Sequence, residues 1–141
     1  MLVKTLLAEK SGSVACIPPD AGIDEAAALM AARRIGALLV IDDQGVLTGI
    51  IGERDLVRGM AEAGKAVLDK PVSALMTRVL AVSLEDSVDN LMAMMTERRI
   101  RHFPVMDRGR LAGIVSIGDV VKHKIAEAES EARALREYIA G

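Results

Sequence analysis

Two short segments each place an aspartate where a helix is expected to begin. They read GIIGERD at residues 49–55 and GIVSIGD at residues 113–119. A carboxylate accepts two hydroxyl donors at once, and the first turn of a helix offers free N–H groups and partial positive charge to a phosphate. Ser116 and Asp119 also form the Ser-x-x-Asp pattern of a capping box, which starts a helix without any ligand. These two aspartate motifs therefore fit a ligand contact, a helix cap, or both.

The remaining reactive side chains form no local arrangement that favours catalysis. Cys16 is the only cysteine, which excludes an internal disulfide, and one cysteine with two histidines cannot build a structural zinc site. The sequence lacks a Walker-type phosphate loop and a G-x-G-x-x-G segment that opens a helix. Catalysis needs a nucleophile or base held by an orienting partner. We therefore predict that the protein is not an enzyme and holds neither a metal nor a catalytic cofactor.

The composition indicates a small soluble protein with an aliphatic core. Hydrophobic residues make up 51% and charged residues 27% of the 141 residues, and Phe103 and Tyr138 are the only aromatic ones. The sequence offers few aromatic side chains on which nucleic-acid bases could stack. Its net charge of −2 also disfavours nucleic acid as a partner. No uncharged stretch approaches the roughly 18 apolar residues of a membrane span, and residues 1–10 lack the features of a signal peptide. We expect a cytoplasmic protein without nucleic-acid or membrane partners.

An internal duplication organises most of the chain. Setting Ile23 against Val88 defines an offset of 88 − 23 = 65 residues, which aligns the Arg-Arg-Ile at 33–35 with the one at 98–100. After a one-residue deletion in a turn, the two aspartate motifs align as well. So many matches in one order with one gap identify a repeat.

Each copy predicts the element order β-α-β-β-α. A short apolar run precedes a helix with Gly22 or Ser87 as its N-cap, and two strand-like runs around a glycine-bearing turn then predict a hairpin. In the first copy these elements are residues 14–17, 24–34, 37–41, 46–51 and a helix from about 55. In the second copy they are residues 79–82, 88–99, 102–106, 111–115 and a helix from about 119.

The predicted fold class is α+β, with tandem duplicated units packed in pseudo-two-fold symmetry. A three-stranded sheet with helices on one face cannot bury itself alone at roughly 60 residues, so the two copies are expected to pack face to face. We place the first repeat at residues 4–62, a linker at 63–71, the second repeat at 72–125 and a C-terminal helix extension at 126–141.

The last predicted helix is long and carries a heptad seam. Its apolar positions are spaced 4, 3, 4, 3 and 4 residues apart, as in a coiled coil. They are Val121, Ile125, Ala128, Ala132, Leu135 and Ile139. This seam fits either a helix folded back on its own domain or a self-association helix in a homodimer.

The duplicated unit with its two aspartate motifs resembles a cystathionine-β-synthase-type (CBS) domain pair, also called a Bateman module, over roughly residues 4–125. The second motif fits the family pattern closely, whereas the first has Gly52 where the family usually has Ser or Thr. The resemblance implies that clefts between the repeats bind an adenine nucleotide such as AMP, ADP, ATP or NAD. It also implies that the motif aspartates, Asp119 and Asp55, accept hydrogen bonds from ribose hydroxyls, and that Ser116 contacts sugar or phosphate.

The resemblance further implies that the phosphate end of the Asp119 cleft carries a basic pair. That pair is Arg101 and His102, and its counterparts in the first copy are Gly36 and Ala37. An arginine fork suits phosphate geometry, although Arg101 also fits a solvated cation near a helix C-terminus. Gly36 would let the base or ribose approach the backbone.

The walls around adenine are expected to be aliphatic. The resemblance implies Ala15, Ile35 and Ala37 for the cleft of Asp119, and Leu80 and Ile100 for the cleft of Asp55. Ile35 and Ile100 fit an ordinary core equally well. Lys10 lies near the first cleft by alignment, where it fits either a phosphate contact or a solvated lysine.

Two functions from different classes remain open at this point. The leading hypothesis is a nucleotide-responsive regulatory module, in a homodimer, that acts on a partner protein in trans. The alternative is a constitutive interaction or oligomerisation scaffold that keeps the fold but has lost ligand binding. Gly52, Gly36 and Ala37 favour the scaffold for one cleft. Ser116, Arg101 and Asp119 oppose it for the other.

Overall fold

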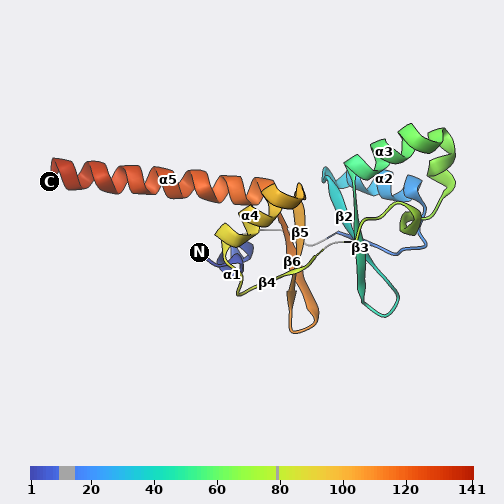
Figure 1. The fold of residues 1–141 in the computed structure, drawn as a ribbon, viewed down its shortest axis with the longest axis horizontal. Coiled ribbons are helices and arrows are strands. Elements are labelled where there is room, and N and C mark those ends of the chain that lie inside the picture. Colours follow the sequence, from blue (N-terminus) through green and yellow to red (C-terminus); the bar gives the residue numbers. More distant parts are fainter. Residues whose placement is uncertain (10–14, 79) are drawn as a thin grey trace. The chain divides into compact units, whose positions relative to one another are not determined.

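The computed structural model describes residues 1–9, 15–78 and 80–141, and these residues form two compact units (Figure 1). The first unit falls within residues 13–80. The second unit combines the N-terminal segment, within residues 1–12, with residues 81–141. Each unit holds a three-stranded sheet together with helices, which confirms the α+β class predicted from the sequence.

The first unit follows the predicted β-α-β-β-α order. Its elements are β1 (Cys16–Ile17), α2 (Ile23–Arg33), β2 (Ala37–Ile41), β3 (Leu47–Gly52), α3 (Glu53–Ala63) and two 3₁₀ helices, η1 (Gly64–Asp69) and η2 (Val72–Ala74). The central strand β2 runs parallel to β1 and antiparallel to β3. The stretch predicted as a linker, 63–71, is largely η1, whose Val67 is buried in the core of this unit. It therefore packs as part of the first unit.

The second unit repeats this order and extends it at both ends. Its elements are α1 (Val3–Ala8), β4 (Val82–Ser83), α4 (Val88–Arg98), β5 (His102–Asp107), β6 (Arg110–Ser116) and α5 (Ile117–Ala140). The central strand β5 runs parallel to β4 and antiparallel to β6. Val14 and Val79, predicted in the first strand of each copy, lie outside the described residues.

Local residue types account for several element boundaries. Ser87 caps α4 as predicted, because its Oγ accepts a hydrogen bond from the Asn90 N–H at 3.0 Å. Gly22 precedes α2 and supplies no side-chain cap. Both hairpin turns need a glycine, because φ is +79° at Gly45 and +78° at Gly109, a region that L-residues with a side chain rarely adopt.

Both cores are almost wholly aliphatic, as the composition predicts. The buried core of the first unit consists of Ile17, Ala21, Ile23, Ala26, Met30, Leu38, Val40, Ile51, Val67 and Val72. That of the second unit consists of Val3, Leu6, Val82, Val88, Leu91, Met95, Phe103, Val105, Val115 and Val120. Phe103 is the largest fully buried side chain of the described chain, so the second core is built around it.

Each unit is completed by a segment that precedes the other repeat in the sequence. The helix α1 precedes the first repeat, yet its Val3 and Leu6 are buried in the second unit. The Val3 N–H donates to the Asp86 carbonyl at 2.8 Å, and the Val72 N–H donates to the Ala21 carbonyl at 2.7 Å. Asp86 and Ala21 are equivalent in the duplication, since 86 − 21 = 65. The segments that contain Val3 and Val72 are therefore equivalent as well. Each is buried in the unit of the repeat that it does not directly precede, and we call them the exchanged segments.

These exchanged segments explain the glycine that opens each aspartate motif. A Cβ atom built on Gly49 would lie 2.8 Å from the Thr77 carbonyl oxygen, and one built on Gly113 would lie 2.7 Å from Leu7 Cδ1. Both approaches are closer than carbon side chains tolerate. A residue without a side chain lets the exchanged segment cross the strand at close range.

Gly49→Ala is expected to lower the free energy of unfolding by about 1–3 kcal/mol, the usual cost of overpacking. Its new methyl group meets a backbone carbonyl that is hydrogen-bonded to β3 and cannot move alone. The matched variant Gly113→Ala is expected to cost less, because the Leu7 side chain can rotate away. Urea denaturation of both variants measures the difference. Equal costs would contradict a backbone clash at Gly49.

The helix α5 runs without interruption from Ile117 to Ala140 (Figure 1). The larger side chains of its heptad seam are exposed rather than packed on their own unit. The structure thus differs from the interpretation that this helix folds back on its own domain. No helix in the described part of the chain is both long and apolar enough to cross a membrane.

Candidate functional site

The helix α5 begins with the capping box predicted at Ser116. The Ser116 N–H and hydroxyl both donate to Asp119 Oδ2, at 2.8 and 3.0 Å, and the Asp119 N–H donates to Ser116 Oγ at 3.2 Å. These bonds hold the carboxylate at the first turn, where unpaired N–H groups and the helix dipole favour negative charge. The cap interpretation of this motif is confirmed, and contact of Asp119 with a ligand stays a prediction.

Strand pairing brings the predicted phosphate residues beside this cap. His102, the first residue of β5, pairs with Ser116, the last residue of β6. The Arg101 carbonyl accepts a hydrogen bond from the Ile117 N–H at 2.8 Å. Arg101 is exposed and His102 is half-buried. Four residues predicted for one site therefore lie at the same end of the second sheet, around the start of α5.

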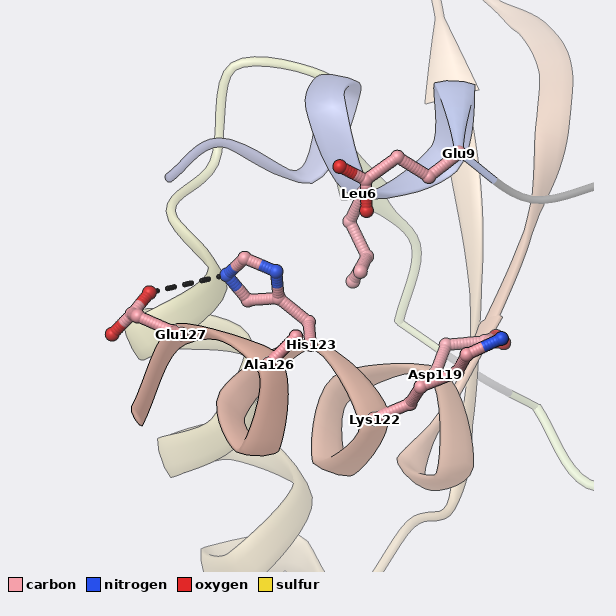
Figure 2. A pocket seen from close by; sticks show the side chains of 7 residues that line it. All are labelled: Leu6, Glu9, Asp119, Lys122, His123, Ala126 and Glu127. Atoms are coloured by element: carbon pink, nitrogen blue, oxygen red, sulfur yellow. Dashed lines mark hydrogen bonds and ion pairs between the residues drawn. The ribbon is translucent and has the colours of Figure 1, made fainter. Parts of the chain in front are cut away.

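A pocket of about 560 Å³ lies beside Asp119. Figure 2 shows that α5 supplies one wall of this pocket and α1 the other. The lining residues are Leu6, Glu9, Asp119, Lys122, His123, Ala126 and Glu127. The three carboxylates of this pocket accept hydroxyl donors such as those of a sugar, whereas the phosphate contacts are predicted at Arg101 and His102, which do not line this pocket. Of the residues predicted for the site, only Asp119 lines this pocket in the described chain.

A hydrogen bond and two ion pairs lie along α5 next to this pocket. His123 Nε2 lies 3.2 Å from Glu127 Oε2, as Figure 2 shows. Lys124 Nζ lies 2.8 Å from Asp89 Oδ1 of α4 and 3.6 Å from Glu127 Oε1. The hydrogen bond from Lys124 lowers the pKa of the Asp89 carboxyl, and the same bond raises the pKa of the Lys124 ammonium. These contacts join α5 to α4 next to the pocket.

Asp55, the equivalent aspartate of the first unit, is buried, and its carboxylate accepts three hydrogen bonds from protein donors. The Gly52 N–H donates to Asp55 Oδ2 at 2.8 Å, while the Arg58 guanidinium and the Thr77 hydroxyl donate to Oδ1 at 2.9 and 3.2 Å. A ligand diol would have to displace one of these donors. Gly52 has no hydroxyl to complete the capping box, so the two aspartate motifs differ in structure as well as in sequence.

Residues predicted for adenine contact gather at the equivalent end of the first sheet. Ala37 pairs with Gly52 in the β2–β3 ladder, and the Gly36 carbonyl accepts the first N–H of α3 at 3.0 Å. Ile35 and Ala15 are half-buried and pack against the core of this unit. Ile35 therefore packs as an ordinary core residue, which was one of its two predicted roles. A ligand contact by these residues stays a prediction.

The residues predicted for the cleft of Asp55 differ in their burial. Ile100 packs against the core of the second unit, whereas Leu80 is 45% exposed. Lys10, which fits either a phosphate contact or a solvated lysine by alignment, lies outside the described residues. The ligand roles of Leu80 and Ile100 stay predictions.

The pocket residues other than Asp119 were missed in the sequence. Lys122 and His123 follow Asp119 by three and four positions, so helical periodicity could have placed them on the same face. The sequence indicates the positions of Leu6 and Glu9 less clearly. Residues 2–7 match residues 71–76 at an offset of 72 − 3 = 69, which marks this segment as part of the duplication. The structure then shows that it packs on the second repeat.

Several known proteins are similar to nearly the whole chain. The CBS domain-containing protein CBSX3, mitochondrial, of Arabidopsis thaliana is 36% identical over 127 residues, which cover 86% of this chain and 62% of that protein. The chain thus spans less than two thirds of that relative. YhcV of Bacillus subtilis is 33% identical over 86% of each chain. The crystal structure of the CBS-domain containing protein ATU1752 from Agrobacterium tumefaciens is 48% identical, with a TM-score of 0.84 over 87% of this chain and 92% of that one.

Two further similar structures contain adenosine ligands. The CBS domain pair of protein MJ0100 is 28% identical, with a TM-score of 0.79 over 90% of this chain and 98% of that one, and was solved with 5′-methylthioadenosine and S-adenosyl-L-methionine. PAE2072 from Pyrobaculum aerophilum is 25% identical, with a TM-score of 0.76 over 84% of this chain and 89% of that one, and was solved with AMP.

The pattern of the CBS domain matches the chain twice, over residues 10–62 and 72–126. These two ranges contain the β-α-β-β-α elements of the duplicated unit and both aspartate motifs. The match covers well over half of the sequence, and the relatives and solved structures above agree with it. This chain belongs to the CBS domain family.

Proposed function

We propose that the protein is a regulatory module that binds an adenine nucleotide, AMP, ADP, ATP or NAD, and acts on a partner protein in trans. The observation that carries the proposal is Asp119, a carboxylate held at the first turn of α5 beside a pocket of about 560 Å³. Two family members solved with adenosine ligands support the same ligand class. The proposal includes a homodimer and cytoplasmic residence, as predicted from the sequence.

In this proposal Asp119 accepts hydrogen bonds from the ribose hydroxyls. The N–H and hydroxyl of Ser116 donate to its Oδ2, and a carboxylate accepts several donors at once, so one side chain can serve both as a helix cap and as a ribose contact. Arg101 and His102, at the start of β5, supply the phosphate contacts. Ala15, Ile35 and Ala37, with the backbone of Gly36, contact adenine. Asp119 lines a pocket, whereas Asp55 is buried, so the proposal takes Asp119 as the primary nucleotide contact.

Regulation then follows from differential binding. A nucleotide can shift an equilibrium between two arrangements of the protein only by as much as its affinities for them differ. The proposed output is therefore a change in how the protein contacts its partner, with no chemical step on the nucleotide.

The test is a titration of the purified protein with AMP, ATP, NAD and S-adenosyl-L-methionine by calorimetry and thermal shift. A ligand at 100 times its dissociation constant is expected to stabilise the folded state by about 2.7 kcal/mol. Binding heat together with a raised melting temperature supports the proposal. No heat and no stabilisation at millimolar concentrations of all four would contradict it and favour the interaction scaffold.

A further inference from the structure

The strongest unexplained surface of the molecule is the heptad seam on α5. Four of its side chains are large, apolar and well exposed in the described chain: Val121 at 48%, Ile125 at 55%, Leu135 at 60% and Ile139 at 74%. Ala128 and Ala132 complete the same stripe. Apolar residues that recur every 3.5 residues are buried when a second helix supercoils around the first. The stripe is continuous along α5, which Figure 1 shows as one helix.

The charges that flank the seam indicate which helix covers it. With Ile125, Ala132 and Ile139 at a positions, Lys124 and Glu131 stand at g positions on one side of the seam. Lys122, Glu129 and Arg136 stand at e positions on the other side. In coiled coils these flanking positions set partner choice and orientation.

A parallel, in-register pair of α5 helices makes these charges complementary. Each g residue then faces the e residue five positions later in the other copy. Lys124 faces the partner's Glu129, and Glu131 faces the partner's Arg136. Both pairs join opposite charges, and the two-fold axis repeats each of them. Lys124 also contacts Asp89 and Glu127 in its own chain, so Glu131–Arg136 is the better pair to test.

An antiparallel pair that aligns the same apolar residues brings like charges together. In that arrangement e positions face e positions and g positions face g positions across the seam. Lys122 would face the partner's Arg136, Glu129 the partner's Glu129 and Glu131 the partner's Glu131. All three contacts are repulsive, so the flanking charges disfavour this orientation.

We propose that α5 forms a parallel, in-register, two-stranded coiled coil with a second copy of this chain. The inference rests on the homodimer of the proposed function and specifies the surface and orientation of that dimer. The seam is only three heptads long and includes two alanines, so it sets orientation more than it supplies affinity. The two C-terminal ends lie side by side in this arrangement.

Cysteine cross-linking tests the orientation directly. In a Cys16→Ser background, Gly141→Cys is expected to form a disulfide-linked dimer under mild oxidation, because a parallel pair brings both ends together. An antiparallel pair would place these residues about 30 Å apart, at 1.5 Å of rise per residue. The matched control Ser130→Cys lies on the outer face of α5 and is expected to cross-link far less. Efficient cross-linking at Gly141→Cys supports the proposal, and cross-linking no better than the control overturns it.

Charge reversal tests the pairing independently, by sedimentation equilibrium of the full chain. Arg136→Glu is expected to weaken self-association by about tenfold, because two attractive pairs become repulsive. The double variant Arg136→Glu, Glu131→Arg is expected to restore association, because it places opposite charges at the same two positions again. The control Arg133→Glu makes the same charge change on the outer face and is expected to have no effect. Tighter association of Arg136→Glu would indicate an antiparallel pair and overturn the proposal.

The same measurements separate this inference from the function on which it rests. A chain that is monomeric at every concentration overturns both the homodimer and the coiled coil. A dimer that neither cross-links at Gly141→Cys nor responds to Arg136→Glu overturns the coiled coil alone. Nucleotide titrations of Arg136→Glu report on the Asp119 site in either case.

Discussion

Replacing Phe103 by alanine is expected to lower the free energy of unfolding by about 3–5 kcal/mol. Phe103 is fully buried in the second unit, where an otherwise aliphatic core surrounds it. The substitution removes apolar contact and leaves a cavity that short aliphatic side chains cannot fill. The free energy of unfolding of a native protein is only about 5–15 kcal/mol. This single change is therefore expected to remove a large part of it. Equilibrium urea denaturation measures the loss.

The chain supplies a matched control for this prediction. Tyr138, the only other aromatic residue, is 84% exposed near the end of α5. Tyr138→Ala is expected to change the free energy of unfolding by less than about 0.5 kcal/mol, as surface substitutions usually do. Similar losses for the two variants would contradict a core built around Phe103.

Replacing Asp119 by alanine is expected to weaken nucleotide binding by about 10- to 100-fold. The loss corresponds to charge-assisted hydrogen bonds of about 1.5–3 kcal/mol between the carboxylate and the ribose hydroxyls. Isothermal titration with the nucleotide that binds the parent protein measures it. The variant also loses the bonds to Ser116 that cap α5, which is expected to cost about 1 kcal/mol of stability. Titration well below the melting temperature separates the two effects.

Asp55→Ala is the matched control in the other repeat. Asp55 bonds to Gly52, Arg58 and Thr77 within the first unit. Removing its carboxylate is therefore expected to lower stability, by about 1–3 kcal/mol for buried donors left without an acceptor, and to leave nucleotide affinity within about twofold. An unchanged affinity in Asp119→Ala, or an equal loss in Asp55→Ala, would contradict the assignment of Asp119 as the primary contact.

Local and repeated features of this fold could be predicted from the sequence. The hairpins around Gly45 and Gly109 and the N-cap at Ser87 depend on residues within a few positions of one another. The capping box of Ser116 and Asp119 depends on a spacing of three. The duplication then allowed each copy to support the interpretation of the other. The family, the fold class and both aspartate motifs followed from this information.

The exchange of segments and the surroundings of the two aspartates were decided by tertiary structure. Whether α1 packs on the first or the second repeat depends on which core accepts Val3 and Leu6, a contact with residues about 80 positions away. Thr77 reaches Asp55 across 22 positions for the same reason. The sequence by itself determined the repeat, its elements and the helix start that holds Asp119. Folding decided that Asp55 is buried and that Asp119 lies beside a pocket, because burial depends on residues that only long-range packing brings together.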